Sequence, residues 1–325
     1  MQSQSGCYKK NPTWPYVLRW NEMRQEIEQA VTLLAKRDPK ALDEALELLQ
    51  GTVFSFSMKV CGRREDAEDT MQEVLVKSIP HLPKFESPRA LLVWLYRVAK
   101  NRCLMSRRRS KFAPKQELSL DQLMPDKLEM ELLSKEGPAT PESQAIRDQQ
   151  ARRLREAVQQ LPPQYRIILV LRDMEGLSDD EVAEITGLKP GNVRVRLHRA
   201  RLFVRKELAQ QHSAQRVATK AATRVPQRPA VSVHLERPAS CKAMFAELSD
   251  YLDEQLDDSV CEKLEQHIDD CDACKAFLSS LETTIDRLRK IPKDRLSRAI
   301  ATKLRAKLLA ELSFALILGS GQAHD

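Results

Sequence analysis

The stretch SDDEVAEITGLKPGNVRVRLHRARLFV, residues 178–204, predicts two helices joined by a tight turn. Ser178 and Glu181 have the spacing of a capping box, which marks the start of the first helix. Gly187 ends that helix and Asn192 opens the second. On the second helix, one stripe at helical spacing is apolar: Val193, Leu197, Ala200 and Val204. The pattern is typical of a helix-turn-helix.

The opposite face of the second helix suits nucleic acid. It presents Arg194, Val195, His198, Arg199 and Leu202. The stretch 189–206 holds seven basic residues and no acid. An ordinary solvated charged face would leave the capping box and the turn unexplained. We therefore expect Arg194 and Arg199 to reach guanine edges or phosphates in a major groove, and Asn192 to meet a phosphate.

Composition limits the fold class. Among 325 residues only nine are glycine, 5% are aromatic and 30% are charged, with a formal net charge of +7. A glycine-poor chain rich in Leu, Ala, Glu and Arg is mainly helical, so we predict an all-α fold. An all-β sandwich and a glycine-rich nucleotide-binding fold do not match this composition. The length suits two or three domains.

The apolar runs and the cysteines indicate the cellular compartment of the protein. No run of 18 apolar residues occurs, and the longest, near 308–318, is interrupted by polar residues. The first twenty residues show no secretory signal, so we expect a cytoplasmic protein without stable membrane insertion. Seven cysteines in that compartment are not a disulfide framework. Cys7, Cys61 and Cys103 lie among apolar residues, whereas the other four crowd beside His267.

Charge divides the chain into parts. Residues 97–111 hold seven basic residues and no acid. Residues 117–142 hold seven acids, two lysines and three prolines, which is typical of a poorly structured acidic linker. Residues 241–290 hold thirteen acids and six basic residues, a net charge of −7. The expected parts are an N-terminal extension (1–24), a helical module (25–111), an acidic linker (112–144), a helix-turn-helix module (145–211), a basic linker (212–240), a cysteine module (241–290) and an amphipathic tail (291–325).

The first helical module contains two informative helices. Residues 65–74 form an acid-rich amphipathic helix, with apolar residues at Ala67, Met71, Val74 and Ile79. The next helix buries one stripe, made of Leu92, Leu95, Ala99 and Cys103. Its other side carries an aromatic ring among cations and an amide, namely Trp94, Arg97, Asn101 and Arg108. That equipment suits single-stranded nucleic acid, because bases stack on rings and phosphates meet arginines.

Both modules resemble the extracytoplasmic-function sigma factors of bacterial RNA polymerase. Residues 161–165 (LPPQY), 171–178 (LRDMEGLS) and 193–201 (VRVRLHRAR) are similar to region 4 of that family. The resemblance implies a module that reads the −35 promoter element and touches the polymerase flap. The base-reading positions that carry over are Arg194, Val195, His198 and Arg199.

Residues 65–74 and 85–101 resemble region 2 of the same family. The resemblance implies docking on the polymerase clamp through Asp66, Asp69, Gln72 and Glu73. It implies capture of a flipped −10 base by Glu86, Ser87 and Arg89, beside the strand-binding Trp94, Arg97, Asn101 and Arg108. The acidic linker corresponds to the segment that relatives thread through the polymerase cleft, where its charge mimics nucleic acid.

The cysteine module predicts a metal site. His267, Cys271 and Cys274 follow at i, i+4 and i+7, which we interpret as one helix face within reach of one ion. Zinc prefers four sulfur and nitrogen ligands, so Cys241 is the expected fourth, from a neighbouring antiparallel helix over 245–252. Cys261 lies about 120° around the helix from His267 and suits this role less. The alternatives are a plain apolar stripe and a redox CxxC site, but no βαβ pattern surrounds the latter.

This spacing, with LSDYLDEQL at 248–256, resembles the zinc-binding anti-sigma domain. The resemblance implies regulation in cis, in which the acidic module packs against the basic modules and masks polymerase or DNA surfaces, with zinc loss on oxidation as a further hypothesis. The tail carries apolar residues at Leu296, Ile300, Leu304 and Leu308. We expect it to close the zinc domain or contact the sigma modules, rather than lie on a membrane.

The sequence thus predicts a transcription initiation factor whose partners are core RNA polymerase and promoter DNA, with one zinc ion and no catalytic residues. Two alternatives stay open. A helix-turn-helix regulator without polymerase contact would leave the helix at 65–74 unexplained. A zinc-dependent anti-sigma or adaptor protein would leave the two basic modules unexplained.

Overall fold

The computed structural model describes residues 16–36, 38–78, 80–85, 87–106, 117–125, 129, 144–220, 239–302 and 305–306. Within these ranges the regular structure is entirely helical, which confirms the all-α prediction. The chain forms two compact units. Unit 1 comprises Met1–Trp14, Gln116–Leu169 and Gly191–Ile291, and unit 2 comprises Pro15–Lys115, Val170–Pro190 and Pro292–Asp325. Among the expected site residues, Glu86 and Arg108 lie outside the described ranges.

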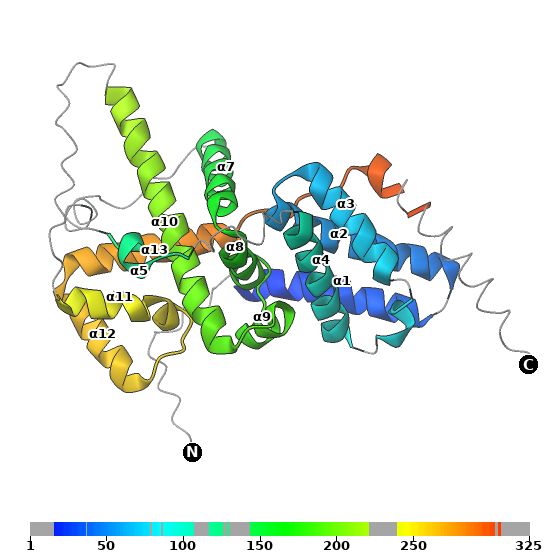
Figure 1. Ribbon diagram of the computed structural model, residues 1–325, viewed down its shortest axis with the longest axis horizontal. Coiled ribbons are helices and arrows are strands. Elements are labelled where there is room, and N and C mark those ends of the chain that lie inside the picture. The colour runs from blue at the N-terminus through cyan, green and yellow to red at the C-terminus, as the bar shows by residue number, and fades with distance from the viewer. Residues whose placement is uncertain are drawn as a thin grey trace, which may run out of the picture. The chain divides into compact units, whose positions relative to one another are not determined.

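Unit 2 is built on a four-helix bundle (Figure 1, blue to teal). Its helices are α1 (Tyr16–Ala35), α2 (Pro39–Cys61), α3 (Arg64–Ser78) and α4 (Pro88–Ser106), with a short 3-10 turn at Leu82–Lys84. Asp38 caps α2 by accepting the amides of Lys40 and Ala41, and Gly62 ends it with a φ of 77°. The predicted apolar stripes of α3 and α4 are buried in the bundle core: Ala67, Met71, Val74, Leu92, Leu95, Ala99 and Cys103.

Two core cysteines of the bundle were not expected to pair. Cys61 at the end of α2 and Cys103 near the end of α4 form a disulfide, with their Cα atoms 5.6 Å apart. The expectation from composition considered only the redox compartment, whereas helix packing brings these two buried residues to bonding distance. The hydroxyl oxygen of Thr70 lies 3.8 Å from each sulfur atom.

Unit 2 also contains the π-helical turn η2 (Val170–Met174) and α9 (Asp179–Thr186). The predicted capping box of α9 is confirmed, because the Glu181 amide donates to Ser178 and the Ser178 amide donates to the Glu181 carboxylate. Gly187 ends α9 with a φ of 75°, a left-handed conformation that favours glycine. Glu175, just before α9, pairs with the buried Lys59 and accepts a 3.0 Å bond from the Tyr96 hydroxyl.

The described part of the tail contacts the bundle. Lys293 Nζ lies 2.8 Å from a carboxylate oxygen of Glu26 on α1, and Arg305 Nη1 lies 2.6 Å from Glu47 on α2. Leu296 and Ile300 are half-buried. Of the roles expected for the tail, these contacts match an association with the sigma modules.

Unit 1 holds the remaining helices. They are α5 (Leu120–Leu123), α7 (Gln144–Gln160), α8 (Pro163–Leu169), α10 (Pro190–Lys220), α11 (Ala239–Leu252), α12 (Asp258–Asp270) and α13 (Asp272–Arg289), with Pro190 itself assigned to unit 2. The helix α10 continues nine residues past the expected boundary at Gln211. The helices α11, α12 and α13 gather beside α10, and their cluster of buried apolar side chains includes Leu202 of α10 (Figure 1).

Part of the acidic linker is ordered, contrary to expectation. Residues 117–125 are described and contain α5, and both Leu123 and Met124 are buried in the apolar cluster of unit 1. The high acid and proline content of the whole linker hides these apolar positions, which explains the error. No helix in the described parts of the chain is long and apolar enough to cross a membrane.

Candidate metal centre and nucleic-acid interfaces

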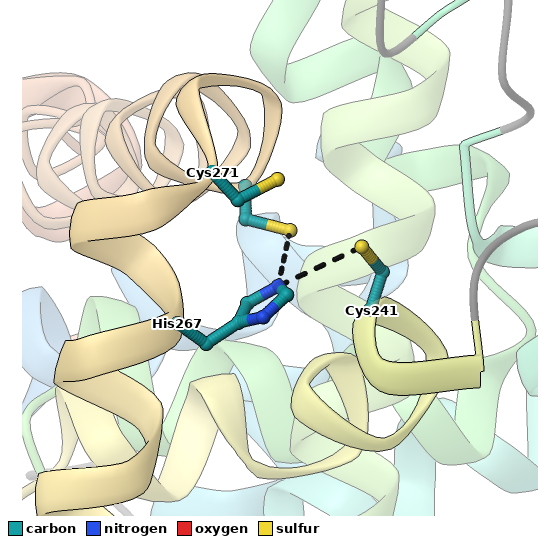
Figure 2. A group of neighbouring side chains, drawn as sticks. Cys241, His267 and Cys271 are labelled. Atoms are coloured by element: carbon teal, nitrogen blue, oxygen red, sulfur yellow. Dashed lines mark hydrogen bonds between the residues drawn. The ribbon is translucent and has the colours of Figure 1, made fainter.

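Four side chains in unit 1 converge as metal ligands would. The ligand atoms of Cys241, His267, Cys271 and Cys274 all lie within 4.8 Å of one another. The ring nitrogen Nε2 of His267 is 3.6 Å from the sulfur of Cys241 and 3.2 Å from that of Cys274. Figure 2 shows Cys241 on α11 directed toward the ring of His267, with Cys271 after α12 beside them. The predicted set of four is therefore brought together.

The expected reason for this convergence was wrong. His267, Cys271 and Cys274 do not share one helix face, because α12 ends at Asp270 and α13 begins at Asp272. Cys271 lies between them with extended dihedral angles, φ −128° and ψ 95°. In an unbroken helix, residues 267 and 274 would be separated by about 10 Å along the axis, too far to share an ion. The break between the helices is what closes the site.

The site fits a zinc ion. Three sulfurs and one nitrogen are a common zinc ligand set, and tetrahedral coordination at about 2.3 Å places sulfurs about 3.8 Å apart, within the observed spread. Burial, together with the neighbouring Cys271 and Cys241, raises the pKa of the Cys274 thiol. A thiol in these surroundings loses its proton when a cation compensates the charge. Cys261 is buried in the apolar core outside this cluster, in line with its lower ranking as a ligand.

The expected DNA-reading face of α10 is only partly accessible. Asn192 is exposed, Val195 is 51% exposed, and Arg194 and Arg199 are half-buried. The prediction that His198 and Leu202 are exposed was wrong. Both are buried, because the cysteine module packs on this part of the helix.

Polar contacts join α10 to the cysteine module. The ring nitrogen Nδ1 of His198 lies 2.7 Å from the Ser249 hydroxyl of α11. Arg201 is fully buried and donates two bonds, of 2.7 and 3.0 Å, to the carboxylate of Asp253. The side-chain exposure of Asp253 is only 6%. This pair was missed from the sequence, where only the opposite charges of module and helix pointed to a contact.

A second arginine of α10 makes a further set of contacts. The nitrogen Nε of Arg205 donates to the Ser280 hydroxyl of α13 at 2.7 Å. Its guanidinium carbon lies 3.9 Å from the ring centroid of Phe277, a cation–π geometry. Another guanidinium nitrogen lies 3.2 Å from Glu129 of the linker. Arg205 therefore ties α10 to both the module and the linker.

In unit 2, the expected strand-binding face of α4 is at the surface. Ser87, Arg89, Arg97 and Asn101 are exposed, and the half-buried ring of Trp94 lies near those of His81 and Phe85, at 5.5 and 5.8 Å between centroids. Two of these arginines also meet α9. Arg97 donates to the backbone oxygen of Glu184 at 2.8 Å, and Arg89 donates to its carboxylate at 3.3 Å.

The expected polymerase contacts lie on α3. Asp69 is exposed, and Asp66, Gln72 and Glu73 are half-buried. Glu73 accepts from Lys77 at 2.7 Å and pairs with Arg102 at 2.6 Å. The hydrogen bond from Lys77 and the charges of both cations lower the pKa of Glu73 against the effect of desolvation. The helix thus presents acidic and amide groups outward, as a docking surface requires.

Comparison with known proteins matches this architecture. Residues 46–112 match the family "Sigma-70 region 2", residues 151–204 match "Sigma-70, region 4", and residues 241–275 match a "Putative zinc-finger" family. The ECF RNA polymerase sigma factor SigE of Mycolicibacterium smegmatis is 30% identical over 198 residues, covering 60% of this chain and 73% of the relative. The chain belongs to the ECF sigma factors of RNA polymerase.

Two further sigma factors are similar over most of their own length. SigW of Bacillus subtilis, an ECF RNA polymerase sigma factor, is 25% identical over 186 residues, 57% of this chain and 98% of the relative. The RNA polymerase sigma-H factor of Pseudomonas aeruginosa is 28% identical over 189 residues, 57% of this chain and 95% of the relative. As an ECF sigma factor, the protein recognises promoters and recruits RNA polymerase. Hereafter α2–α4 are called region 2, and α7–α10 region 4.

The buried His198 of region 4 should make the contact with the cysteine module sensitive to pH. Burial and the charges of Arg201 and Arg199 lower the pKa of His198 from 6.5 to about 4, against the opposing charge of Asp253. A depressed pKa means that the contact is fully stable above pH 6.5 and weakens as the pH falls from 6.5 toward 4. At pH 5.5 the contact should be weakened by about tenfold relative to pH 7.5.

Hydrogen exchange of the α11 amides at the two pH values, corrected for intrinsic rates, measures this effect. His198→Gln keeps a polar side chain but does not titrate, so most of the pH dependence should disappear in that variant. Zinc content is measured at both pH values, because loss of the ion would also loosen the module. Equal pH dependence in the variant and the wild type would contradict the assignment to His198.

Proposed function

We propose that this ECF sigma factor is held inactive by its own cysteine module, which covers part of the DNA-reading helix of region 4. The observation that carries the proposal is the burial of His198, one of the expected −35 contacts, against Ser249 of the module. The buried pair of Arg201 with Asp253 holds the same surfaces together. Opposite charge supports the association, since the module carries a net charge of −7 and the stretch 189–206 seven basic residues without an acid.

In the open state, each module would contribute a separate contact. Region 4 would read the −35 element through Asn192, Arg194, Val195, His198 and Arg199. Region 2 would bind the opened −10 strand through Glu86, Ser87, Arg89, Trp94, Arg97, Asn101 and Arg108. The polymerase clamp would be met by Asp66, Asp69, Gln72 and Glu73. We assign no catalytic step to the chain, because the polymerase makes the RNA, and we place its action in the cytoplasm, where polymerase and promoters are.

We further propose that one zinc ion holds the module together through Cys241, His267, Cys271 and Cys274. A structural zinc ion supplies folding energy that a helical module of about 50 residues lacks in its own core. The ligands come from α11, from α12 and from the start of α13, so the ion would fix the arrangement of all three helices. Ser249 and Asp253, the residues that contact region 4, lie within or just after α11.

Run-off transcription with core polymerase tests the proposal. The full-length protein is compared with a truncation that ends at Lys220, the last residue of α10, on a library of upstream sequences. We expect transcription with the truncation to exceed that with the full chain by about tenfold or more, the factor for each 1.4 kcal/mol of released contact energy. If only the full-length protein supports transcription and the truncation does not, the module is a required part of the sigma factor. If neither protein supports transcription from any template, the result would contradict function as a sigma factor.

A further inference from the structure

The linker between regions 2 and 4 has its own docking place on unit 1. Leu123 and Met124 are 5% and 4% exposed and belong to the same buried cluster as Leu202 of α10 and Phe245 of α11. Leu118 and Leu120, also from the linker, are partly buried against this cluster. The segment therefore contributes to a core shared by region 4 and the cysteine module.

Polar contacts fix the backbone of this segment as well. The amide of Leu118 donates to the Tyr165 hydroxyl of α8 at 3.2 Å. Lys206 of α10 donates to the backbone oxygen of Gln122 at 2.5 Å. Arg205, which contacts α13, also pairs with Glu129 of the linker at 3.2 Å. Anchors at both ends and a buried apolar centre characterise a bound peptide rather than a chain that passes over a surface.

We propose that region 4 and the cysteine module together form a binding site for linker residues 118–124, and that occupation of this site limits how far region 2 can reach from region 4. The proposal rests on the proposed function, in which the two regions bind the −10 and −35 elements of one promoter. It adds a mechanism distinct from the masking of His198, because it acts on the distance between the regions.

The length of the linker determines how far region 2 can lie from region 4. From Ser106 at the end of α4 to Gln144 at the start of α7, a fully extended linker spans about 130 Å at about 3.5 Å per residue. With Leu118 docked, the chain from Ser106 spans only about 40 Å. The two promoter elements lie about 25 base pairs apart, or roughly 85 Å at about 3.4 Å per base pair. The free linker covers this distance, and the docked linker covers about half of it.

The length of α4 does not make up the difference between the docked linker and the distance between the promoter elements. The part of α4 between Trp94 and Ser106 adds about 18 Å at 1.5 Å per residue. The docked chain and this helix together reach about 58 Å. The rest of the distance would have to lie within region 4, with the chain stretched to its limit, which costs conformational entropy. Because the bound follows from chain length alone, it holds whichever other contacts between the regions are broken.

A pair of insertions in the full-length protein tests the reach directly. Twenty Gly/Ser residues inserted between Pro114 and Lys115 lengthen the stretch before the docked segment by up to about 70 Å. The same insertion between Gly137 and Pro138 lies after the docked segment and leaves the limiting stretch unchanged. Since Asn192, Arg194, Val195 and Arg199 are not buried, region 4 retains partial access to DNA, so we expect the first insertion to raise run-off transcription several-fold and the second to have no effect.

A second measurement reports docking itself. Hydrogen exchange should show protected amides at Leu118, Leu123 and Met124, which donate hydrogen bonds, in the wild type and in both insertion variants, and Leu123→Asp should abolish this protection. Gln122→Asp, which adds the same charge at an exposed neighbour, should not. Zinc content must be retained in Leu123→Asp, so that loss of the whole module is recognised. Removal of the metal by a chelator should also expose 118–124, because the module forms one side of the site.

The outcomes separate the two proposals. Unprotected amides at Leu118, Leu123 and Met124 in the wild type would overturn linker docking. In a second outcome, the two insertion variants transcribe equally while a variant that breaks the Asp253 contact transcribes more. That result would overturn the proposal that docking limits the reach of region 2, and it would leave the masking of region 4 intact. If breaking the Asp253 contact also has no effect, the inhibitory role of the module fails instead.

Discussion

Asp253→Ala should raise run-off transcription by the full-length sigma factor by about tenfold to hundredfold, because it removes the carboxylate that accepts two hydrogen bonds from a buried guanidinium. Arg201 is fully buried, and the two bonds of its guanidinium to Asp253 join α10 to the module. Removal of one partner of such a pair costs about 3–5 kcal/mol. The module would have to leave α10 to hydrate Arg201. The contacts of His198 and Arg205 still hold the module on α10 in this variant. The expected rise in transcription is therefore smaller than the full cost of breaking the pair would give.

The position of Asp253 makes this variant informative. It lies on the module, so every residue of region 4 that touches DNA or polymerase remains as in the wild type. Glu262→Ala is the matched control, since it removes an exposed carboxylate from α12 of the same module. Zinc content should be unchanged in both variants. Unchanged transcription by Asp253→Ala would argue against inhibition through this surface, and reduced transcription would identify the module as an activator.

The parts of the fold that local sequence determines were predictable. The capping box at Ser178, the turn at Gly187 and the buried stripe of α10 follow from the spacing of a few neighbouring residues, and the structure has all three. The helical stripes of α3 and α4 were predicted for the same reason. Periodicity within one helix shows which face is buried, provided that a single partner covers that helix.

The face of α10 that meets two partners was not predictable in this way. His198 and Leu202 lie opposite the apolar stripe and would be solvated if region 4 stood alone. Their burial depends on α11, whose Ser249, in contact with His198, is 51 positions away in the chain. The docked linker segment and the pairing of Cys61 with Cys103 are likewise long-range results. The average composition of the linker could not show that four apolar residues within 118–124 would pack into the apolar core of unit 1.

The metal centre shows a correct set of ligands reached by an incorrect geometry. Spacing identified His267, Cys271 and Cys274, and elimination added Cys241. A single helix could not have brought three of them to one ion, and the sequence carried a signal for the break. Five of the six residues from Asp269 to Cys274 are aspartate or cysteine, which have low helix propensity and so weaken the helix between α12 and α13.

Cys274→Ser should abolish stoichiometric zinc binding and unfold the cysteine module. The Cys274 side chain is buried among the other three ligands, and its thiolate is required for the charge balance of the site. Structural zinc contributes on the order of 10 kcal/mol to folding in small modules, more than a module of this size gains from its core. We therefore expect amides throughout α11–α13 to lose protection, and transcription to rise to the level of the truncation at Lys220.

Cys261→Ala is the matched control for this variant. Cys261 is buried on α12 and is disulfide-bonded, but it lies outside the four ligands, so the variant loses this disulfide bond and should keep its zinc. Metal analysis of the purified proteins and hydrogen exchange of α11–α13 are read together with run-off transcription. Retention of zinc by Cys274→Ser would remove this cysteine from the ligand set. Loss of zinc and of protection without a rise in transcription would show that the folded module does not inhibit, because the surface that buries His198 would then be gone while the sigma factor stayed silent.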